Sequence, residues 1–338
     1  MTITVRMASL VCAGALAFGS AVEQRASAEV NQVQIALGYG IGYLPLAIMQ
    51  DGKLIEKHLK EAGLANASVV WAQIGAGSAM NDALLSGTLH FASGGVTPFL
   101  LLWDKTRGSY DVKGVGTLCS MPSFLNTRNP NIKSVKDFTD KDRIALAGAG
   151  SGVQTIYLQM AVAKAFGIKN YGKLNPIMVN LSHPEGMAAF LSGTEVNSHF
   201  TAPPFQYQEL ARPGVHKVLS SYDIMGGSSS FLMVWATSKF RNENPKTYAA
   251  VFGAFREATD ILNRDKKRAA EIYVKSSKGK DSADEILKML DDPDTKFTLT
   301  PERVMKFVEF MNEVGTLKNK PSSWKDLFMP EVHDLPGS

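Results

Sequence analysis

A hexapeptide that occurs twice, with only its second residue changed, indicates how this chain folds. Residues 83–88 read Ala-Leu-Leu-Ser-Gly-Thr and are followed by Pro98 and Phe99, while residues 189–194 read Ala-Phe-Leu-Ser-Gly-Thr and are followed by Pro204 and Phe205. An Ile-Ala-Leu run before a glycine-rich loop precedes each copy. A repeat spacing of about one hundred residues is the size of a domain rather than of a solenoid unit. The sequence therefore predicts two similar lobes with a cleft between them.

Strands and helices are expected to alternate within each copy. In the first copy, the residue pattern predicts strands at 33–37, 69–74 and 89–92 and helices at 44–64 and 78–86, with a further helix opening at 98–103. In the second copy it predicts strands at 143–146, 176–180 and 196–199 and helices at 154–166 and 185–192. This alternation is typical of parallel βαβ units, so the expected fold class is α/β with two doubly wound lobes.

The lobes are expected to combine distant parts of the chain. Strand-like runs at 112–118, 218–221 and 231–237 lie where two crossover strands could form a hinge. Lobe one is expected to contain residues 29–118 and 228–338, and lobe two residues 119–227. The tail is predicted to be helical and to pack on lobe one. Its expected helix starts are Pro245, a capping box at 282–285, and Thr-Pro-Glu at 300–302.

The first 28 residues predict a secretory signal. Arg6 precedes an apolar run at 8–22, and Ala-Ser-Ala at 26–28 fits a cleavage site near Ala28. The run is shorter than the roughly 20 residues that span a bilayer, which disfavours a membrane anchor. Cys12 leaves lipidation as an alternative. We therefore expect a periplasmic protein. After cleavage of the signal its only cysteine would be Cys119, which is expected to be a small buried side chain without a disulfide.

Composition and motifs exclude several classes of function. The formal net charge is +4, and no Lys/Arg cluster interleaved with aromatics is present, so nucleic-acid binding is not expected. The third glycine of G-x-G-x-x-G is missing, and there is no P-loop, no G-x-S-x-G elbow and no H-E-x-x-H motif. We therefore expect neither a cofactor nor a metal. His183, His199 and His216 are interpreted as surface or loop residues.

Three junctions between strands and helices are rich in small residues, at 38–42, 75–78 and 148–152. In open α/β sheets, ligands bind beyond the carboxyl ends of the strands. Helix N-termini there offer unpaired N–H groups and a partial positive charge, which attract anions without an arginine. Ser78, Ser151 and Gln154 could add side-chain donors. These loops favour ligand binding over catalysis, because they supply no acid, base and nucleophile together.

Aromatic residues near these loops complete the predicted pocket. Tyr39 and Tyr43 are expected to form its walls, whereas Phe99 and Phe205 are assigned to the core. Aromatic walls with a few hydrogen-bond donors are typical of sites for small molecules.

The order of these motifs resembles one family. The loop at 38–45, the stretch at 75–87, Ile-Lys-Ser-Val-Lys-Asp-Phe at 132–138 and the segment at 244–258 are similar to parts of the substrate-binding proteins of nitrate/sulfonate/taurine-type ABC importers. The resemblance covers roughly residues 30–330. It implies a type II periplasmic-binding fold that closes on a small organic anion or an aromatic ligand and delivers it to permease subunits in the inner membrane. It implies a binding protein rather than an enzyme. The protein is also expected to be a monomer.

The resemblance also implies the ligand contacts, by position. They are Tyr39, Gly40, Tyr43, Ala76, Gly77, Ser78, Gly95, Ser151, Gly152, Gln154 and Thr201. Asn197 stands where the family has an acidic residue, and the segment at 201–205 replaces one that contains tryptophan, so the ligand class stays open. Two alternatives remain. One is an exported enzyme or a protein that binds or processes thiamin pyrimidines on the same fold, although its cysteine-rich motif is missing. The other is a receptor subunit that reports to a sensor.

Overall fold

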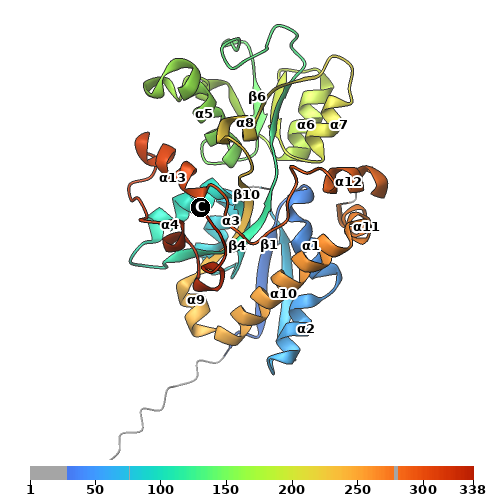
Figure 1. Cartoon of the computed structure of the whole chain (residues 1–338), viewed down its shortest axis with the longest axis vertical. Coiled ribbons are helices and arrows are strands. Elements are labelled where there is room, and N and C mark those ends of the chain that lie inside the picture. Colours follow the sequence, from blue (N-terminus) through green and yellow to red (C-terminus); the bar gives the residue numbers. More distant parts are fainter. Residues whose placement is uncertain (1–28, 76, 278–280) are drawn as a thin grey trace, which may run out of the picture.

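The computed structural model describes residues 29–75, 77–277 and 281–338. The expected signal segment, residues 1–28, lies outside the described residues. Figure 1 shows two lobes stacked along the long axis, joined by extended segments near the middle. This arrangement confirms the two-lobe α/β prediction. Among the helices of the described ranges, none has the length and apolar character needed to cross a membrane.

Lobe one is built on two small sheets. Strand β1 (Gln32–Leu37) pairs in parallel with β2 (Ser68–Gln73), and β10 (Ser230–Thr237) pairs antiparallel with both β3 (Ala92–Gly95) and β4 (Val112–Ser120). A bridge between Ile35 and Phe91 links the two sheets. The helices of this lobe are η1 (Ile41–Tyr43), α1 (Leu44–Asp51), α2 (Leu54–Glu61), α3 (Gly77–Leu85) and α4 (Val96–Thr106).

Lobe two contains one five-stranded sheet in the order β7-β6-β8-β5-β9. Its strands are β5 (Phe124–Thr127), β6 (Ile144–Leu146), β7 (Met178–Asn180), β8 (Ser198–Thr201) and β9 (His216–Ser220). Its helices are α5 (Val153–Phe166), α6 (His183–Ser192), α7 (Phe205–Leu210) and α8 (Ser221–Met225). Strand β5 was not predicted, and it runs antiparallel to both of its neighbours, so the sheet is mixed rather than wholly parallel.

The repeated hexapeptide builds the same structure in both lobes. Gly87 and Gly193 each adopt a positive φ, +78° and +80°, directly after α3 and α6. Ser86 and Ser192 donate hydrogen bonds from Oγ to the carbonyl three residues earlier, at 3.0 Å and 2.8 Å. In each copy the serine hydroxyl also lies within hydrogen-bond distance of the threonine hydroxyl that follows the glycine. The repeat is therefore a helix-ending motif, in which glycine tolerates the left-handed conformation.

The tail begins with helices packed on lobe one. They are α9 (Ser238–Glu243), α10 (Pro245–Arg264), α11 (Lys266–Ser277) and α12 (Ala283–Leu290), followed later by α13 (Val304–Glu313). The apolar face of α10 buries Val251, Phe255 and Leu262 against the core that contains α1 and α2. Pro245 at the start of α10 and the capping box at Ser282 are confirmed.

Two predicted helices differ in the structure. The helix expected at 44–64 is two helices, because Lys53 takes a left-handed conformation with φ 48° and ends the first helix at Gly52. The helix start expected at 300–302 is wrong, since α13 begins at Val304. Residues before it run extended beside the strands that join the lobes, and their backbone pairs with those strands instead of with itself.

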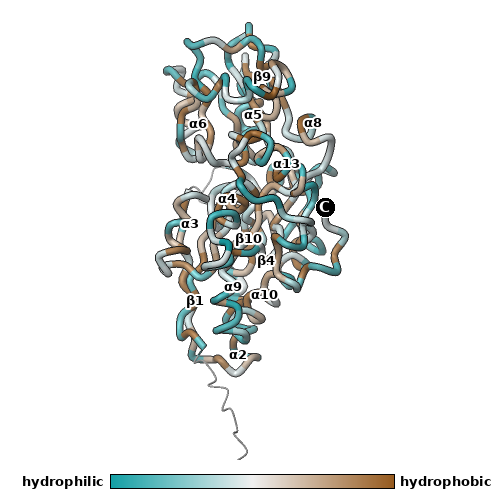
Figure 2. Tube along the Cα trace, turned by 90° about the vertical axis from the view of Figure 1, so that its left-hand side faces the viewer, coloured by the Kyte–Doolittle hydropathy of each residue, from teal (hydrophilic) through white to brown (hydrophobic). Residues whose placement is uncertain are grey.

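Strands β4 and β10, which are labelled in the middle of Figure 2, connect lobe one to β5 and α8 of lobe two. Strand β9, also considered for the hinge, pairs with β5 inside lobe two instead. The lobe boundaries expected at 118 and 228 fall near the upper ends of the two crossing strands and remain a prediction. The buried Cys119, fully enclosed at the end of β4, confirms the expected small core side chain.

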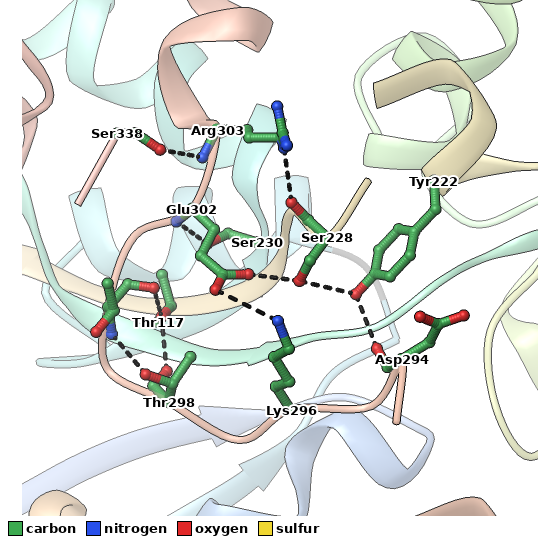
Figure 3. Close-up of polar contacts among 11 residues, drawn as sticks. Thr117, Tyr222, Ser228, Ser230, Asp294, Lys296, Thr298, Glu302, Arg303 and Ser338 are labelled. Carbon is green, nitrogen blue, oxygen red and sulfur yellow. Dashed lines mark hydrogen bonds and ion pairs between the residues drawn. The ribbon is translucent and has the colours of Figure 1, made fainter. Parts of the chain in front are cut away.

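The tail makes a third connection between the lobes (Figure 3). Thr117 in β4 donates from Oγ1 to the Thr298 carbonyl at 2.6 Å, and Glu302 accepts a 2.6 Å hydrogen bond from the Ser228 hydroxyl. Tyr222 of α8 donates to the Asp294 carbonyl at 2.9 Å, so the same segment also reaches lobe two. The C-terminal part therefore contacts lobe two in addition to the lobe on which α10 packs.

Candidate functional site

Four helices point their N-termini at one cavity between the lobes. Helix α3 begins at Gly77 and α4 follows Gly95 in lobe one, while α5 follows Gly152 and α6 begins at His183 in lobe two. All four of these residues line an inner cavity of about 40 Å³. Each helix N-terminus carries roughly half a positive charge on unpaired N–H groups. The inner cavity is therefore surrounded by hydrogen-bond donors from both lobes.

Glycine caps leave the donors of α4 and α5 free, whereas Ser182 and Glu185 form a capping box at α6. Gly95 and Gly152 precede α4 and α5 in an extended conformation and supply no side-chain acceptor for the first turn. Gly95 also lets the lobes approach, because a Cβ there would lie 3.0 Å from Val153 of the other lobe. Only N–H groups without a side-chain cap remain available to a ligand. The sequence therefore leaves these first turns open to an anion from outside the chain.

Gln154 has the clearest unmet hydrogen bond at the cavity. It lines the inner cavity from the first turn of α5 and is only 3% exposed. Its side-chain Nε2 is buried without a hydrogen-bond partner among the described residues. A buried donor without a partner costs free energy, so such groups generally have a ligand or water as partner. The Gln154 amide is suited to donate to an acceptor atom in the cavity.

Among the described residues that line the inner cavity, His183 is the only histidine. It is the first residue of α6, is 9% exposed, and its Nδ1 lies 2.9 Å from the Thr201 hydroxyl. Burial, and secondarily the nearby His199, lower the pKa of His183 to about 3, so the imidazole is neutral at physiological pH. The ring stacks on Phe205 with centroids 5.8 Å apart. A neutral imidazole can donate or accept one hydrogen bond through Nε2.

A buried hydrogen bond between His199 and Glu209 supports this part of lobe two. His199 Nδ1 lies 2.5 Å from Glu209 Oε1, both side chains are fully buried, and Asn126 donates to the other carboxylate oxygen at 2.9 Å. Gly186 of α6 packs directly on the imidazole, because a Cβ there would lie 2.5 Å from His199 Nε2. The His199–Glu209 pair therefore helps to hold α6 in position, and His183 at the start of α6 is held at the cavity with it.

Tyr39 and Tyr43 form part of the cavity wall, as predicted. Burial raises the pKa of the Tyr43 hydroxyl, which keeps it protonated. Gly38 and Gly75 make room for the rings: a Cβ on Gly38 would lie 2.6 Å from Tyr43, and one on Gly75 would lie 3.4 Å from Tyr39. The two tyrosines therefore line the inner cavity from lobe one.

The structure brings most of the predicted site residues together. Those that line the inner cavity are Tyr39, Tyr43, Gly77, Ser78, Gly95, Ser151, Gly152 and Gln154. Gly40 lies beside the inner cavity with a φ of +108°. A Cβ at this position would lie 2.9 Å from the Pro203 carbonyl oxygen, so the close approach requires glycine. Thr201 reaches the cavity only through His183, and Ala76 lies outside the described residues. Whether these residues contact a ligand remains a prediction.

The sequence analysis missed or misplaced several residues. His183 and His199 are buried rather than on the surface or in loops, which corrects that expectation. The sequence contained a signal that could have placed His183 at the start of a helix, because Ser182 and Glu185 have the spacing of a capping box and form one at the start of α6. Phe99 is fully buried in the core as expected, whereas Phe205 packs on His183. Phe231 and Leu232 of β10 also line the cavity, and no local pattern marks them.

The lobes touch across the cleft. Thr97 of α4 donates to the Ser151 carbonyl at 2.7 Å, and the Ile41 N–H donates to the Pro203 carbonyl at 3.2 Å. The structure is therefore a closed arrangement. None of the described residues that line the inner cavity is an Asp, Glu, Lys or Arg. Across residues 29–75, 77–277 and 281–338, no three His, Cys, Asp or Glu side chains are placed to hold a metal.

No protein-family model matches the chain, and no curated protein matches it. Solved structures do. The alkanesulfonate-binding protein SsuA of Xanthomonas axonopodis pv. citri, bound to MOPS, is 17% identical with a TM-score of 0.68, over 86% of this chain and 96% of that one. The nitrate-binding protein NrtA of Synechocystis PCC 6803 is 14% identical with a TM-score of 0.68, over 88% and 84%.

The aliphatic sulphonate-binding protein SsuA of Escherichia coli is 19% identical with a TM-score of 0.63, over 89% of this chain and 92% of that one. Each alignment covers most of this chain and most of the other protein. At such identities the likeness is one of architecture. The chain has the type II periplasmic-binding-protein fold.

Proposed function

We propose that this protein is the solute-binding component of an ABC importer in the periplasm, and that it captures a small organic anion between its lobes. The observation that carries the proposal is the uncharged inner cavity, surrounded by four helix N-termini and the unpartnered Gln154 amide. Such a site compensates a single negative charge with hydrogen bonds rather than with a salt bridge. The structural neighbours include sulfonate- and nitrate-binding proteins, which is consistent with this chemistry.

Hinge closure explains how binding is coupled to delivery. The donors come from both lobes, so a ligand contacts all of them only in the closed arrangement. A ligand that binds one of two conformations more tightly shifts the population toward it. The closed form, acting as a monomer, would then dock on the permease and release the ligand there. In this scheme Tyr39, Gly77, Ser78, Ser151 and Gln154 contact the ligand.

A thermal-shift screen of the chain from Glu29 onward tests the proposal. The probes are nitrate, taurine, alkyl and aromatic sulfonates, aromatic carboxylates and thiamin pyrimidines. A probe at 100 times its dissociation constant should stabilise the protein by about 2.7 kcal/mol. Stabilisation by one chemical class of anion is expected. A well-folded protein without bound ligand that responds to none of the anions would refute the proposal.

Two further measurements separate the alternatives. A probe that is recovered unchanged after incubation supports a binding protein, whereas its conversion to a product would indicate an enzyme. Small-angle scattering with the stabilising probe should show a more compact particle or an increased closed fraction. If the scattering curve is the same with and without a saturating probe, closure is not coupled to binding.

A further inference from the structure

A second and larger cavity adjoins the inner one. We call it the outer chamber, and its volume is about 680 Å³. It lies between the start of α1 in lobe one, helices α6 and α7 of lobe two, and α11 and α12 of the tail. Tyr39 and Tyr43 line both cavities. The two spaces are therefore neighbours across a wall that consists of two aromatic side chains.

The inner cavity alone is too small for most organic molecules. At about 40 Å³ it can hold a few waters or a head group of a few atoms, whereas an engineered cavity of about 150 Å³ is needed for benzene. Sites for small organic ligands usually measure about 300–1,000 Å³. The outer chamber falls within that range. A ligand larger than a simple inorganic anion must therefore extend beyond the inner cavity.

The wall between the cavities can move. The Tyr39 side chain is 41% exposed and makes no hydrogen bond to any described residue. Exposed side chains change rotamer within picoseconds to nanoseconds. Tyr39 is therefore the more mobile of the two aromatic side chains that line both the inner cavity and the outer chamber.

The linings of the two cavities differ in chemistry. The inner cavity presents hydrogen-bond donors and no charged side chain, which suits a compact anionic head. The outer chamber has an apolar surface formed by the partly exposed side chains of Met187, Leu191 and Phe205. Burial of apolar area there stabilises a bound hydrocarbon or aromatic group by about 25 cal/mol per Å². The two cavities together suit a molecule with one polar end and one apolar part.

The charged residues of the outer chamber differ in their partners. Asp281 accepts a hydrogen bond from Gln208, and Glu285 accepts hydrogen bonds from Ser282 in the capping box. Arg212 is an exposed residue at the edge of the chamber, and its side chain makes no hydrogen bond, ion pair or ring contact with any described residue. Its guanidinium is therefore available to an acceptor atom at the far end of a ligand.

We infer that the ligand places a compact anionic head in the inner cavity and an apolar body, at least the size of one aromatic ring, in the outer chamber. This inference rests on the proposed function and adds the size and shape of the ligand to it. Tyr39 and Tyr43 contact the ligand where the head joins the body. Arg212 selects bodies that carry a hydrogen-bond acceptor at the far end.

Titration calorimetry with matched pairs of probes tests this inference. Methanesulfonate and nitrate represent the head alone, and naphthalene-2-sulfonate and its 6-hydroxy derivative carry the same head on an aromatic body. The body-bearing probes should bind at least about tenfold more tightly, since burial of as few as two CH₂ equivalents supplies that factor. The hydroxylated probe should bind more tightly than its parent, and Arg212→Gln should remove that difference.

Variants separate the outer chamber from the inner cavity. Met187→Trp fills part of the chamber and should reduce the affinity for body-bearing probes about tenfold or more, with the affinity for methanesulfonate unchanged. Met305→Trp is the matched control, because Met305 is also partly exposed but lines neither cavity. It should change neither affinity.

The outcomes distinguish this inference from the proposed function. If nitrate or methanesulfonate binds as tightly as the body-bearing probes, or if Met187→Trp affects their binding no more than Met305→Trp, the inference is wrong and the proposed function stands. If no anion of either kind binds the folded protein, both are wrong. If body-bearing probes bind more tightly and only Met187→Trp weakens them, both are supported.

Discussion

Replacement of Gln154 by methionine should make the protein more stable and weaker in binding. The side chain is 3% exposed, and its Nε2 has no partner among the described residues. A buried polar group without a partner costs about 1–3 kcal/mol, and methionine has a similar length without that group. We therefore expect Gln154→Met to raise the free energy of unfolding by about 1–2 kcal/mol in the absence of ligand.

Binding should change in the opposite direction. A hydrogen bond to a charged group is worth about 1.5–3 kcal/mol, so the affinity for the anion should fall about 10- to 150-fold. Urea unfolding, followed by the fluorescence of the four tryptophans, measures the first effect. Titration calorimetry with the tightest anion of the screen measures the second.

Gln159→Met is the matched control on the same helix. Gln159 is 6% exposed, but its Nε2 donates to Asn175 Oδ1 at 3.1 Å. Loss of this bond should destabilise the protein by about 1 kcal/mol and leave binding unchanged. Opposite signs for the two variants are the expected result. If Gln154→Met also lowers stability and binds the anion as well as the parent protein, Gln154 is a structural residue and the reasoning fails.

Three further changes test other parts of the structure. His183 has a pKa of about 3 in the folded protein and is neutral there, whereas in the unfolded chain it protonates near pH 6.5. The free energy of unfolding should therefore fall by about 2 kcal/mol between pH 7 and pH 5. His183→Asn should remove that loss in unfolding measured as a function of pH, and an unchanged pH profile would contradict this. Gly186→Ala should cost about 1–3 kcal/mol in urea unfolding, because its Cβ would overlap His199; wild-type stability would mean that the helix moves freely. Tyr222→Phe removes the hydrogen bond from lobe two to the Asp294 carbonyl of the tail and should cost about 1 kcal/mol, while small-angle scattering shows a more open particle. An unchanged scattering curve would separate this contact from lobe closure.

Local patterns predicted the parts of the fold that depend on neighbouring residues. The repeated hexapeptide marks the ends of α3 and α6, and the capping box at Ser282 marks the start of α12. Both signals act within four residues, through a glycine with positive φ or a side chain that caps the helix. The glycine-rich junctions likewise marked where helix N-termini meet the cleft.

The pairing of segments that are distant in sequence could not be predicted from local patterns. Strand β5 has only four residues and takes its place between β8 and β9 through partners that are distant in sequence. Thr300–Glu302 carries the local pattern of a helix start, but its backbone pairs near β4 and β10 instead. Tertiary contacts decided both cases, because the local preferences amount to less than the hydrogen bonds and buried surface gained elsewhere.

For the candidate site, the sequence by itself determined the two lobes, the glycine-rich loops and most residues around the inner cavity. These follow from the repeat and from the rule that ligands bind where strands lead into helices. Only the tertiary structure decided that His183 is buried at the cavity, that Gln154 lacks a partner, and that an outer chamber lies beyond Tyr39. Burial, unpaired donors and cavity volume depend on how segments far apart in the chain pack together, and no local pattern encodes that packing.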